Sequence, residues 1–217
     1  SIATKGLDLA GKRVVVVAGG TREPIDAVRF IGNSSSGKQG IELAKAAIAR
    51  GAKVKIIAAN IDLELPPVEE VVRVTRTSDL ENALQDVGDC DLLLMPAAVS
   101  DFRVEAPVSE KISRAENPEL NLRLISNPDL IHDFATSRRN SSPLIVGFAA
   151  VDEGDFDKLV KQGRDKLQSK GIDLVVANDI SNGQVFGSEN NDVAIISLEE
   201  AVRVTGTKRE VADAILD

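Results

Sequence analysis

Short runs of β-branched and apolar residues alternate with amphipathic segments along most of this chain. The first run, RVVVVA at residues 13–18, ends at a pair of glycines, and an amphipathic segment follows at residues 36–50. A strand that is apolar on both faces is typical of a parallel sheet with helices on both sides. The repeated alternation therefore predicts a doubly wound α/β fold, with a mostly parallel sheet flanked by helices.

The same patterns place the individual elements. Strands are predicted at residues 13–18, 53–59, 70–75, 91–98, 144–150 and 173–179, and helices at 36–50, 78–87, 127–139, 155–171 and 208–217. A hairpin of residues 192–199 and 201–206 is expected near the end. Residues 99–126 break the alternation, so we expect an extended excursion outside the main sheet, with a half-exposed strand at 119–125. Residues 1–217 are expected to form a single domain.

Capping residues predict where the helices begin and end. Polar side chains that can accept amide hydrogens favour helix starts, and glycine favours helix ends. The predicted caps are Ser36 with Gln39 as a capping box, Ser78 and Asn127 at the starts, and Gly51 and Gly171 at the ends.

Composition excludes several classes of function. The net charge of −8 and an aromatic content of 3% speak against a nucleic-acid surface, which needs clustered Lys and Arg and stacking rings. No apolar run approaches a membrane span of roughly 18 residues, and no signal peptide is recognisable at the start. The single Cys90 excludes an internal disulfide. We therefore expect a cytoplasmic protein without nucleic-acid or membrane partners.

The loop at residues 19–38 is long for a connection between a strand and a helix, and long loops are often functional. Its end reads GNSSSGKQ, which is one residue away from a P-loop, because Gln39 stands where Ser or Thr would hold Mg²⁺. Serines before a helix N-terminus favour binding of an anion. The alternative is an ordinary serine cap on a flexible loop. A G-x-G-x-x-G dinucleotide fingerprint is missing from the AGGTREP segment.

A second loop, PAAVSDF at residues 96–102, follows another predicted strand. Its small residues allow a ligand to approach closely, and the carboxylate of Asp101 can hold a divalent cation or a ribose hydroxyl. Other reactive residue types have plainer interpretations. We expect Cys90 to be buried, His132 to lie on the surface, and Lys111, taken alone, to be a solvated charge.

A solvated helix face is likewise expected for Gln39, Glu42 and Lys45.

Several motifs together resemble one known family. AGGTREPIDAVRFIGNSSSGKQG, PAAVSDF, EKI, NPDLI, VGFAA and ANDISNGQVFGSENN occur in this order and span most of the chain. They resemble the phosphopantothenoylcysteine synthetases, in particular the C-terminal synthetase domain of the bifunctional bacterial coenzyme A enzyme. The resemblance implies a Rossmann-like, dimeric, nucleotide-binding ligase. It would join 4′-phosphopantothenate and L-cysteine through an acyl-cytidylate, which forms from CTP with release of pyrophosphate and later CMP.

The resemblance also implies a set of site residues. Asn33 and Lys111 would be catalytic, and Arg29 would reach into the neighbouring subunit's site. Substrate would contact Arg29, Asn33, Ala97, Ala98 and Asp101, and the nucleotide would contact Gly19, Ser35, Ser36, Gly37, Asp101, Phe102, Lys111, Asp129 and Phe148. Mg²⁺, with Asp101 as a ligand, Lys111 and the helix amides would offset the repulsion between the substrate carboxylate and the phosphates.

The sequence also departs from the family pattern. EKISR replaces the usual EKIKK, and Val151-Asp152 replaces Glu-Thr after GFAA. A flavin-dependent decarboxylase domain is the fused partner that the resemblance implies, and the motifs leave open whether the native chain carries it. Two other functions stay open at this point, an NAD(P)-binding oxidoreductase and a non-catalytic nucleotide-binding module. Nicotinamide binding would identify the first, and CTP binding without pyrophosphate release the second.

Overall fold

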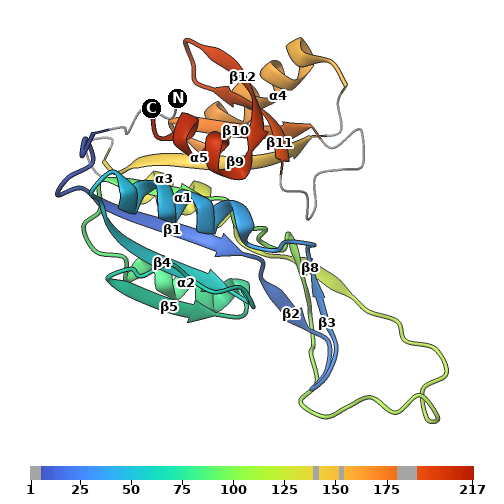
Figure 1. The fold of residues 1–217 in the computed structure, drawn as a ribbon. Coiled ribbons are helices and arrows are strands. Elements are labelled where there is room, and N and C mark those ends of the chain that lie inside the picture. The colour runs from blue at the N-terminus through green and yellow to red at the C-terminus, as the bar shows by residue number, and fades with distance from the viewer. Residues whose placement is uncertain (1–5, 139–141, 152–153, 180–189) are drawn as a thin grey trace.

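The computed structural model describes residues 6–138, 142–151, 154–179 and 190–217. It shows an eight-stranded sheet with helices on both faces and a narrow arm that projects from one edge (Figure 1). The strands lie in the order β12-β11-β10-β9-β6-β1-β4-β5. Their bounds are Arg13–Gly19 (β1), Lys53–Ala59 (β4), Glu70–Val74 (β5), Leu92–Met95 (β6), Leu144–Val151 (β9), Leu174–Asp179 (β10), Asn190–Ile196 (β11) and Ala201–Thr207 (β12).

The helices divide between the two faces of the sheet. Helices α1 (Lys38–Ala49) and α5 (Lys208–Ile215) cover one face, and α2 (Thr77–Gln85), α3 (Leu130–Ser137) and α4 (Phe156–Lys170) cover the other. Within β1, Val14 and Val16 pack on the α1 side while Val15 and Val17 pack on the opposite side. Alternate residues of a strand point to opposite faces, so burial on both faces explains the unbroken apolar run.

The strand order identifies where ligands should bind. The six strands β5-β4-β1-β6-β9-β10 are parallel, and β11 and β12 add an antiparallel hairpin. This confirms the Rossmann-like, mostly parallel fold and the closing hairpin. The chain turns from β1 toward β4 on one side, whereas β6 lies on the other side. In such sheets ligands bind at this switch point, beyond the carboxyl ends of the strands.

Three predicted helix starts are wrong. Helix α1 has Gly37 as its N-cap, and Ser36 Oγ accepts the Lys38 amide at 3.4 Å. The predicted capping box does not form, because the Gln39 side chain bonds to Lys208 and Asn191 instead. Helix α2 begins after Arg76, and Asp79 rather than Ser78 accepts the amide of Arg76 at 2.8 Å.

Helix α3 has Asp129 as its N-cap, because the side chain of Asn127 instead donates to the Ser100 carbonyl at 2.8 Å. At the other end of a helix, the prediction of Gly171 is confirmed: it follows α4 with φ of +66°.

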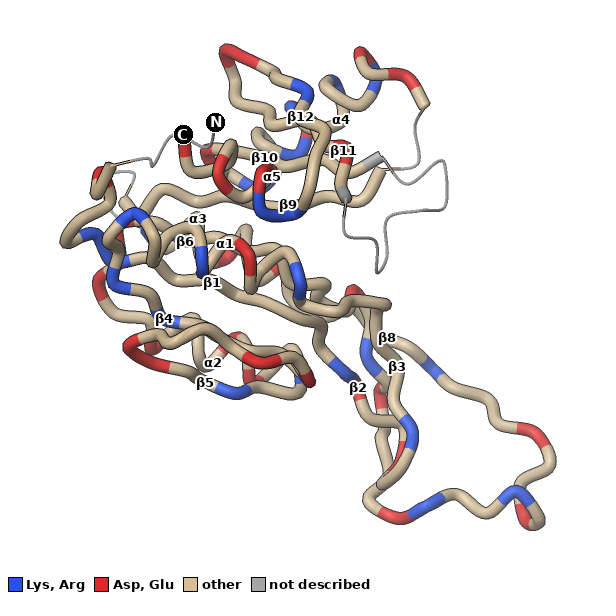
Figure 2. Tube along the Cα trace, in the orientation of Figure 1, with Lys and Arg blue, Asp and Glu red and all other residues tan. Residues whose placement is uncertain are grey.

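The arm consists of two antiparallel ribbons. The first pairs β2 (Arg22–Pro24) with β3 (Phe30–Gly32), and the second pairs β7 (Phe102–Val104) with β8 (Leu124–Ser126). The excursion from the main sheet is therefore confirmed, although its predicted strand at 119–125 shortens to β8. The β2–β3 ribbon inside the first long loop was not predicted. Charged residues of both signs follow the loop between β7 and β8 (Figure 2).

Asp26 joins the two parts of the arm. Its side chain is buried and accepts the amides of Val28, Arg29 and Ile112 at 2.8, 2.7 and 3.2 Å. Loss of hydration raises the pKa of this carboxyl, but the three amides and the charge of Arg29 outweigh that effect and lower its pKa to about 2. The carboxylate thus fastens the turn between β2 and β3 to the loop that contains Lys111.

Among the described residues, none of the helices is both long and apolar enough to cross a bilayer.

Candidate active site

A cavity of about 660 Å³ opens at the carboxyl edge of the sheet, at the switch point between β1 and β6. The loops after β1, β6 and β9 and the start of α1 surround it. Many of the residues predicted for the site line this cavity together: Asn33, Ser35, Ser36, Gly37, Ala97, Ala98, Asp101 and Phe148. The fold thus brings together segments that are more than 100 residues apart in the chain.

The first turn of α1 lines this cavity. Gly37 adopts a left-handed φ of +76° and has no side chain to cap the helix, and the first turn contains no acidic residue. The Lys38 amide makes a long bond, of 3.4 Å, to Ser36 Oγ. The first amides of a helix lack acceptors within the helix, and the helix dipole adds positive potential there. Gly40 lets α1 approach the sheet closely, because a Cβ at this position would lie 2.3 Å from the Ala18 Cβ. The arrangement favours a bound phosphate.

Hydrogen bonds fix the two loops that face α1. The amide of Ala98 donates to the Gly19 carbonyl at 2.9 Å, and the Ser100 amide donates to the Thr21 hydroxyl at 2.8 Å. The Asn33 side chain donates to the Val99 carbonyl at 3.2 Å, which holds its amide beside the small residues of the second loop. Gly19 lies at the end of β1 with φ of +94° and does not line the cavity among the described residues.

An adjoining cavity of about 440 Å³ extends the site toward α3 and α4. Phe102 and Asp129 line this second cavity, and Asp101 and Phe148 line both. Two lysines of α4 that the sequence analysis missed face the same space. Lys166 lines both cavities, and Lys170 lines the second and forms an ion pair with Asp129.

The structure adds further polar residues to the first cavity. Lys38, Asn178, Asn191 and Lys208 line it, and the Oδ1 atom of Asn178 is buried without a hydrogen-bond partner in the described structure. Lysines one helical turn apart, such as Lys166 and Lys170, are a signal that the sequence contains. The signal becomes informative only once the face of α4 that meets the cavity is known. Lys38, Lys166 and Lys208, together with the N-terminus of α1, make the first cavity suited to a polyanion.

Asp101 is the one carboxylate among the described residues that line the first cavity. No group of three or more His, Cys, Asp or Glu side chains that could hold a metal ion occurs in the described residues. A single carboxylate fits a Mg²⁺ ion that takes its other ligands from substrate phosphates and water.

Besides Gly19, the predicted site residues that line neither cavity in the described structure are Arg29 and Lys111. Arg29 sits in the turn between β2 and β3, where it pairs with Asp26 and donates to the Ile112 carbonyl at 3.3 Å. Lys111 precedes Ile112 in the neighbouring loop, so the arm holds the two cations in one region. The described part of neither cavity includes them. The segment 180–189 and the departure at Asp152 lie outside the described residues.

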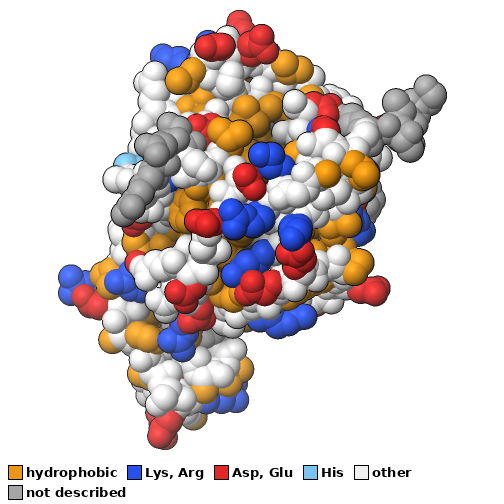
Figure 3. Space-filling view, turned by 90° about the vertical axis from the view of Figure 1, so that its left-hand side faces the viewer, with side chains coloured by type: hydrophobic (Ala, Val, Ile, Leu, Met, Phe, Trp, Pro, Cys, Tyr) orange, Lys and Arg blue, Asp and Glu red, His pale blue; other side chains and the backbone are white. Residues whose placement is uncertain are grey.

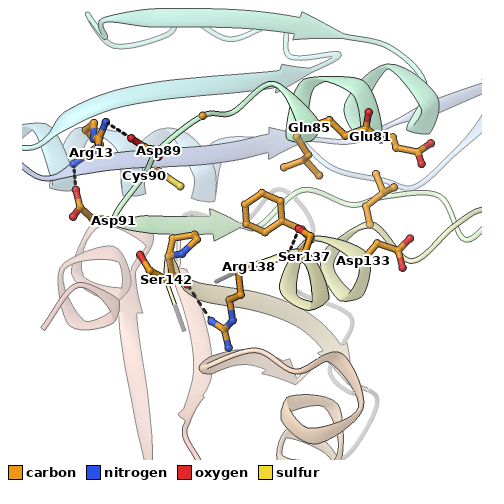
Figure 4. Close-up of a pocket in the computed structure, with 15 residues that line it drawn as sticks. Arg13, Glu81, Gln85, Asp89, Cys90, Asp91, Asp133, Ser137, Arg138 and Ser142 are labelled. Atoms are coloured by element: carbon orange, nitrogen blue, oxygen red, sulfur yellow. Dashed lines mark hydrogen bonds and ion pairs between the residues drawn. The ribbon is translucent and has the colours of Figure 1, made fainter. Parts of the chain in front are cut away.

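A third cavity, of about 650 Å³, lies at the amino ends of the strands (Figure 4). Charged side chains of both signs intermingle on this end of the molecule (Figure 3). Several are paired with each other, such as Arg13 with Asp89 and Arg138 with Asp173. The thiol of Cys90 is buried there, which raises its pKa to about 11, so it packs rather than reacts, as predicted.

Other single polar residues lie partly on the surface and partly within the fold. His132 is exposed, as predicted. Lys45 is exposed and pairs with Glu42, whereas Gln39 is half-buried and bonded, so its assignment to a solvated face is wrong.

Comparisons with known proteins identify the family of the chain. The family profile described as DNA/pantothenate metabolism flavoprotein C-terminal domain matches residues 9–217. The chain is 38% identical over 218 residues to the coenzyme A biosynthesis bifunctional protein CoaBC of Mycobacterium bovis, covering 97% of this chain and 52% of that protein. It is 36% identical over 188 residues to CoaBC of Escherichia coli, covering 85% and 45%. The chain thus spans about half the length of these relatives.

A solved structure extends the similarity to three dimensions. The C-terminal domain of a coenzyme A biosynthesis bifunctional protein CoaBC superposes with a TM-score of 0.78 at 29% identity. The superposition covers 96% of this chain and 93% of that domain.

Proposed function

Because the chain belongs to the DNA/pantothenate metabolism flavoprotein C-terminal domain family, we propose that it is a phosphopantothenate-cysteine ligase of coenzyme A biosynthesis. The observation that carries the proposal is the cavity at the switch point of the sheet. A helix N-terminus whose N-cap residue is a glycine, several lysines and a single carboxylate meet there, beside the side-chain amide of Asn33, which donates to the Val99 carbonyl. These are the parts that joining a carboxylate to a nucleotide requires.

The proposed reaction has two steps. A carboxylate oxygen of 4′-phosphopantothenate attacks the α-phosphorus of CTP. The bond from this phosphorus to the oxygen that bridges to the β-phosphorus breaks. Pyrophosphate departs, and an acyl-cytidylate is formed. The amine of L-cysteine then attacks the acyl carbon, CMP departs, and loss of a proton from nitrogen gives the amide. Neither step needs a side-chain nucleophile, which fits a cavity without a Ser-His-Asp or Cys-His arrangement in its described lining.

The charges in the first step decide which residues matter. A carboxylate must approach a triphosphate, so cations and amide dipoles have to offset the repulsion between them. The amides at the start of α1, with Ser35, Ser36 and Gly37, would hold phosphate oxygens, and Lys166 would add positive charge from α4. Asp101 would hold Mg²⁺ together with phosphate oxygens, and the ion would neutralise charge on the triphosphate when bound.

Asn33 would act at the acyl group. Its side-chain amide already donates one hydrogen bond to the Val99 carbonyl. A carboxamide carries two N–H donors, so the second can stabilise the acyl oxygen as negative charge develops on it. Ala97 and Ala98 leave room for the acyl chain beside it, and Phe148, Phe102 and Asp129 would contact the nucleotide.

A dimer would complete the site. Arg29 and Lys111 lie on the arm, outside the cavities of their own chain, and the Asp26 bracket joins their segments. We propose that the arm delivers these cations to the site of a second subunit. Its exposed apolar side chains, among them Val28, Phe30 and Val108, offer a surface for that contact.

Two further assignments follow the family. The proposed location is the cytoplasm, where the buried thiol of Cys90 stays reduced. The predicted flavin-dependent decarboxylase domain would correspond to the other half of the bifunctional relatives, and it stays a prediction.

The test is a pyrophosphate-release assay with phosphopantothenate and each of the four nucleoside triphosphates, with and without cysteine. We expect CTP to give pyrophosphate and enzyme-bound acyl-cytidylate without cysteine, and CMP and the amide when cysteine is added. Release of a nucleoside diphosphate, or of no pyrophosphate with any nucleotide, would contradict the proposal. Equal rates with the four nucleotides would contradict only the assignment of CTP.

A further inference from the structure

A ring of three hydrogen bonds joins the start of α1 to β11 and α5. The Lys208 ammonium donates to Asn191 Oδ1 at 2.6 Å, Asn191 Nδ2 donates to Gln39 Oε1 at 3.0 Å, and Gln39 Nε2 donates to the Lys208 carbonyl at 3.3 Å. Lys208 and Asn191 are each 7% exposed, and all three residues line the first cavity. The ring therefore lies beside the helix start, at the wall of the first cavity.

None of the three bonds uses an amide N–H of α1. A helix start frays unless something restrains it, and a Ser, Thr, Asp or Asn cap is the usual restraint. Such a cap would consume an amide that a phosphate needs. Gln39 is the second residue of α1, and the ring holds both ends of its carboxamide. The ring thereby restrains the helix start without using an α1 amide, and the bond that the Lys38 amide donates to Ser36 Oγ is long at 3.4 Å.

The other side of the ring is itself rigid. Thr207 accepts the Glu210 amide at 3.2 Å and Glu210 accepts the Thr207 amide at 2.7 Å, so a capping box fixes the start of α5. Lys208 is the first residue of α5, where the helix dipole disfavours a cation, and burial disfavours it further. The presence of a lysine here, despite the unfavourable helix dipole and burial, indicates a role other than packing.

We propose that Lys208 is a positioning residue for the phosphate cradle, acting through Asn191 and Gln39 to hold the first turn of α1 in place. The inference rests on the proposed function, because the cradle is the group that would hold the nucleotide phosphates. Without the ring, the amides of α1 would still exist but would spend part of their time out of register with the phosphates. The loss would therefore appear in phosphate affinity more than in the stability of the fold.

The test compares Lys208→Met, Gln39→Met and the double variant with wild type. Lys45→Met is the matched control, since Lys45 lies on α1, is exposed, and lines the neighbouring groove between α1 and α5 instead of the first cavity. Calorimetry measures the Kd for inorganic tripolyphosphate, and pyrophosphate release gives KM for CTP and for phosphopantothenate. Each single variant should raise the Kd and the KM for CTP about tenfold, while the KM for phosphopantothenate stays within about twofold.

The double variant distinguishes positioning from direct contact. If Lys208 acts through the ring, the double variant should bind no more weakly than the weaker single variant, because one removal already opens the ring. The inference would be overturned if the fold-increases in Kd of the two single variants multiplied in the double variant. It would also be overturned if the Kd of Lys208→Met stayed within about twofold of wild type. If Lys208→Met fails to fold, Gln39→Met decides it by the same Kd threshold. Absence of pyrophosphate release by wild type would defeat the proposed function and leave the tripolyphosphate comparison valid.

Discussion

Single side chains act as brackets between loops in this protein. Asp26 collects three amides from two segments, Thr21 receives the Ser100 amide, and Asn127 holds the Ser100 carbonyl. Each is a short polar side chain that replaces secondary structure where the chain leaves the sheet. Buried backbone groups need partners, and loops beyond a sheet edge lack the regular ladder that supplies them. The shape of the candidate site therefore depends on a few polar residues away from the ligand.

Asp26 gives a prediction about pH. Its folded-state pKa is lowered to about 2, so its stabilising effect is complete above the unfolded value of about 4 and is lost as the pH falls through 2. Protection of the Val28, Arg29 and Ile112 amides against hydrogen exchange, corrected for intrinsic rates, should fall across this window. Asp26→Asn should show low protection that does not change with pH over the same range.

The control for this prediction is Asp133→Asn, which removes an exposed carboxylate from α3. It should leave the three amides as in wild type. Protection in Asp26→Asn that equals wild type at pH 6 would show that the bracket does not depend on the charge.

At the scale of elements, α1 is the helix that matters most for the site. Its start faces the cavity, and its buried side packs on β1 and α5. The contact with β1 is close because Gly40 has no side chain between the helix and Ala18. The height of α1 above the sheet sets the position of its amides relative to the loop after β6.

Gly40→Ala tests this contact, and the sign of its effect is informative. Alanine is a better helix former than glycine by about 1 kcal/mol, so without a clash the variant would be more stable. Because the new Cβ would lie 2.3 Å from the Ala18 Cβ, we expect a loss of about 1–3 kcal/mol in the free energy of unfolding, measured by urea denaturation.

Lys45→Ala, on the exposed side of the same helix, should change the free energy of unfolding by no more than about 0.5 kcal/mol. A Gly40→Ala variant more stable than wild type would show that α1 can move away from the sheet at no cost.

At the scale of the whole molecule, the arm separates two sets of predicted site residues. Asn33 and its neighbours line the cavity, whereas Arg29 and Lys111 lie on the arm. A closed two-fold dimer would place each arm at the other subunit's cavity, so both sites would be shared. In this proposal, the dimer would be part of the catalytic arrangement rather than an addition to it.

Mixed dimers test the shared site. Arg29→Ala and Asn33→Ala homodimers should each be nearly inactive. Random re-association of an equal mixture gives about half heterodimers, each with one site that carries both changes and one that carries neither. Pyrophosphate release should therefore recover to about a quarter of wild type.

The matched control mixes Asn33→Ala with Lys166→Met, both of which line the cavity of one chain. In each heterodimer of that mixture, one site carries Asn33→Ala and the other carries Lys166→Met. Pyrophosphate release should therefore not recover. If the Arg29→Ala mixture also stays inactive although tagged subunits are seen to exchange, the two residues serve the same chain's site.

The sequence by itself determined the sheet, the helices and their alternation. The apolar run of β1 and the glycine after α4 act through neighbours within a few residues, so their effect is readable locally. The order of the motifs also indicated the correct family.

Only the tertiary structure decided the partners of polar side chains. Gln39 looked like part of a capping box, but it bonds to Asn191, 152 residues away. A hydrogen-bonding group takes its best available partner, and which partners are available depends on strand pairing that local sequence does not encode. The same holds for Lys166, Lys170 and Lys208, which are candidate site residues only because the packing of their helices turns them toward the two adjoining cavities.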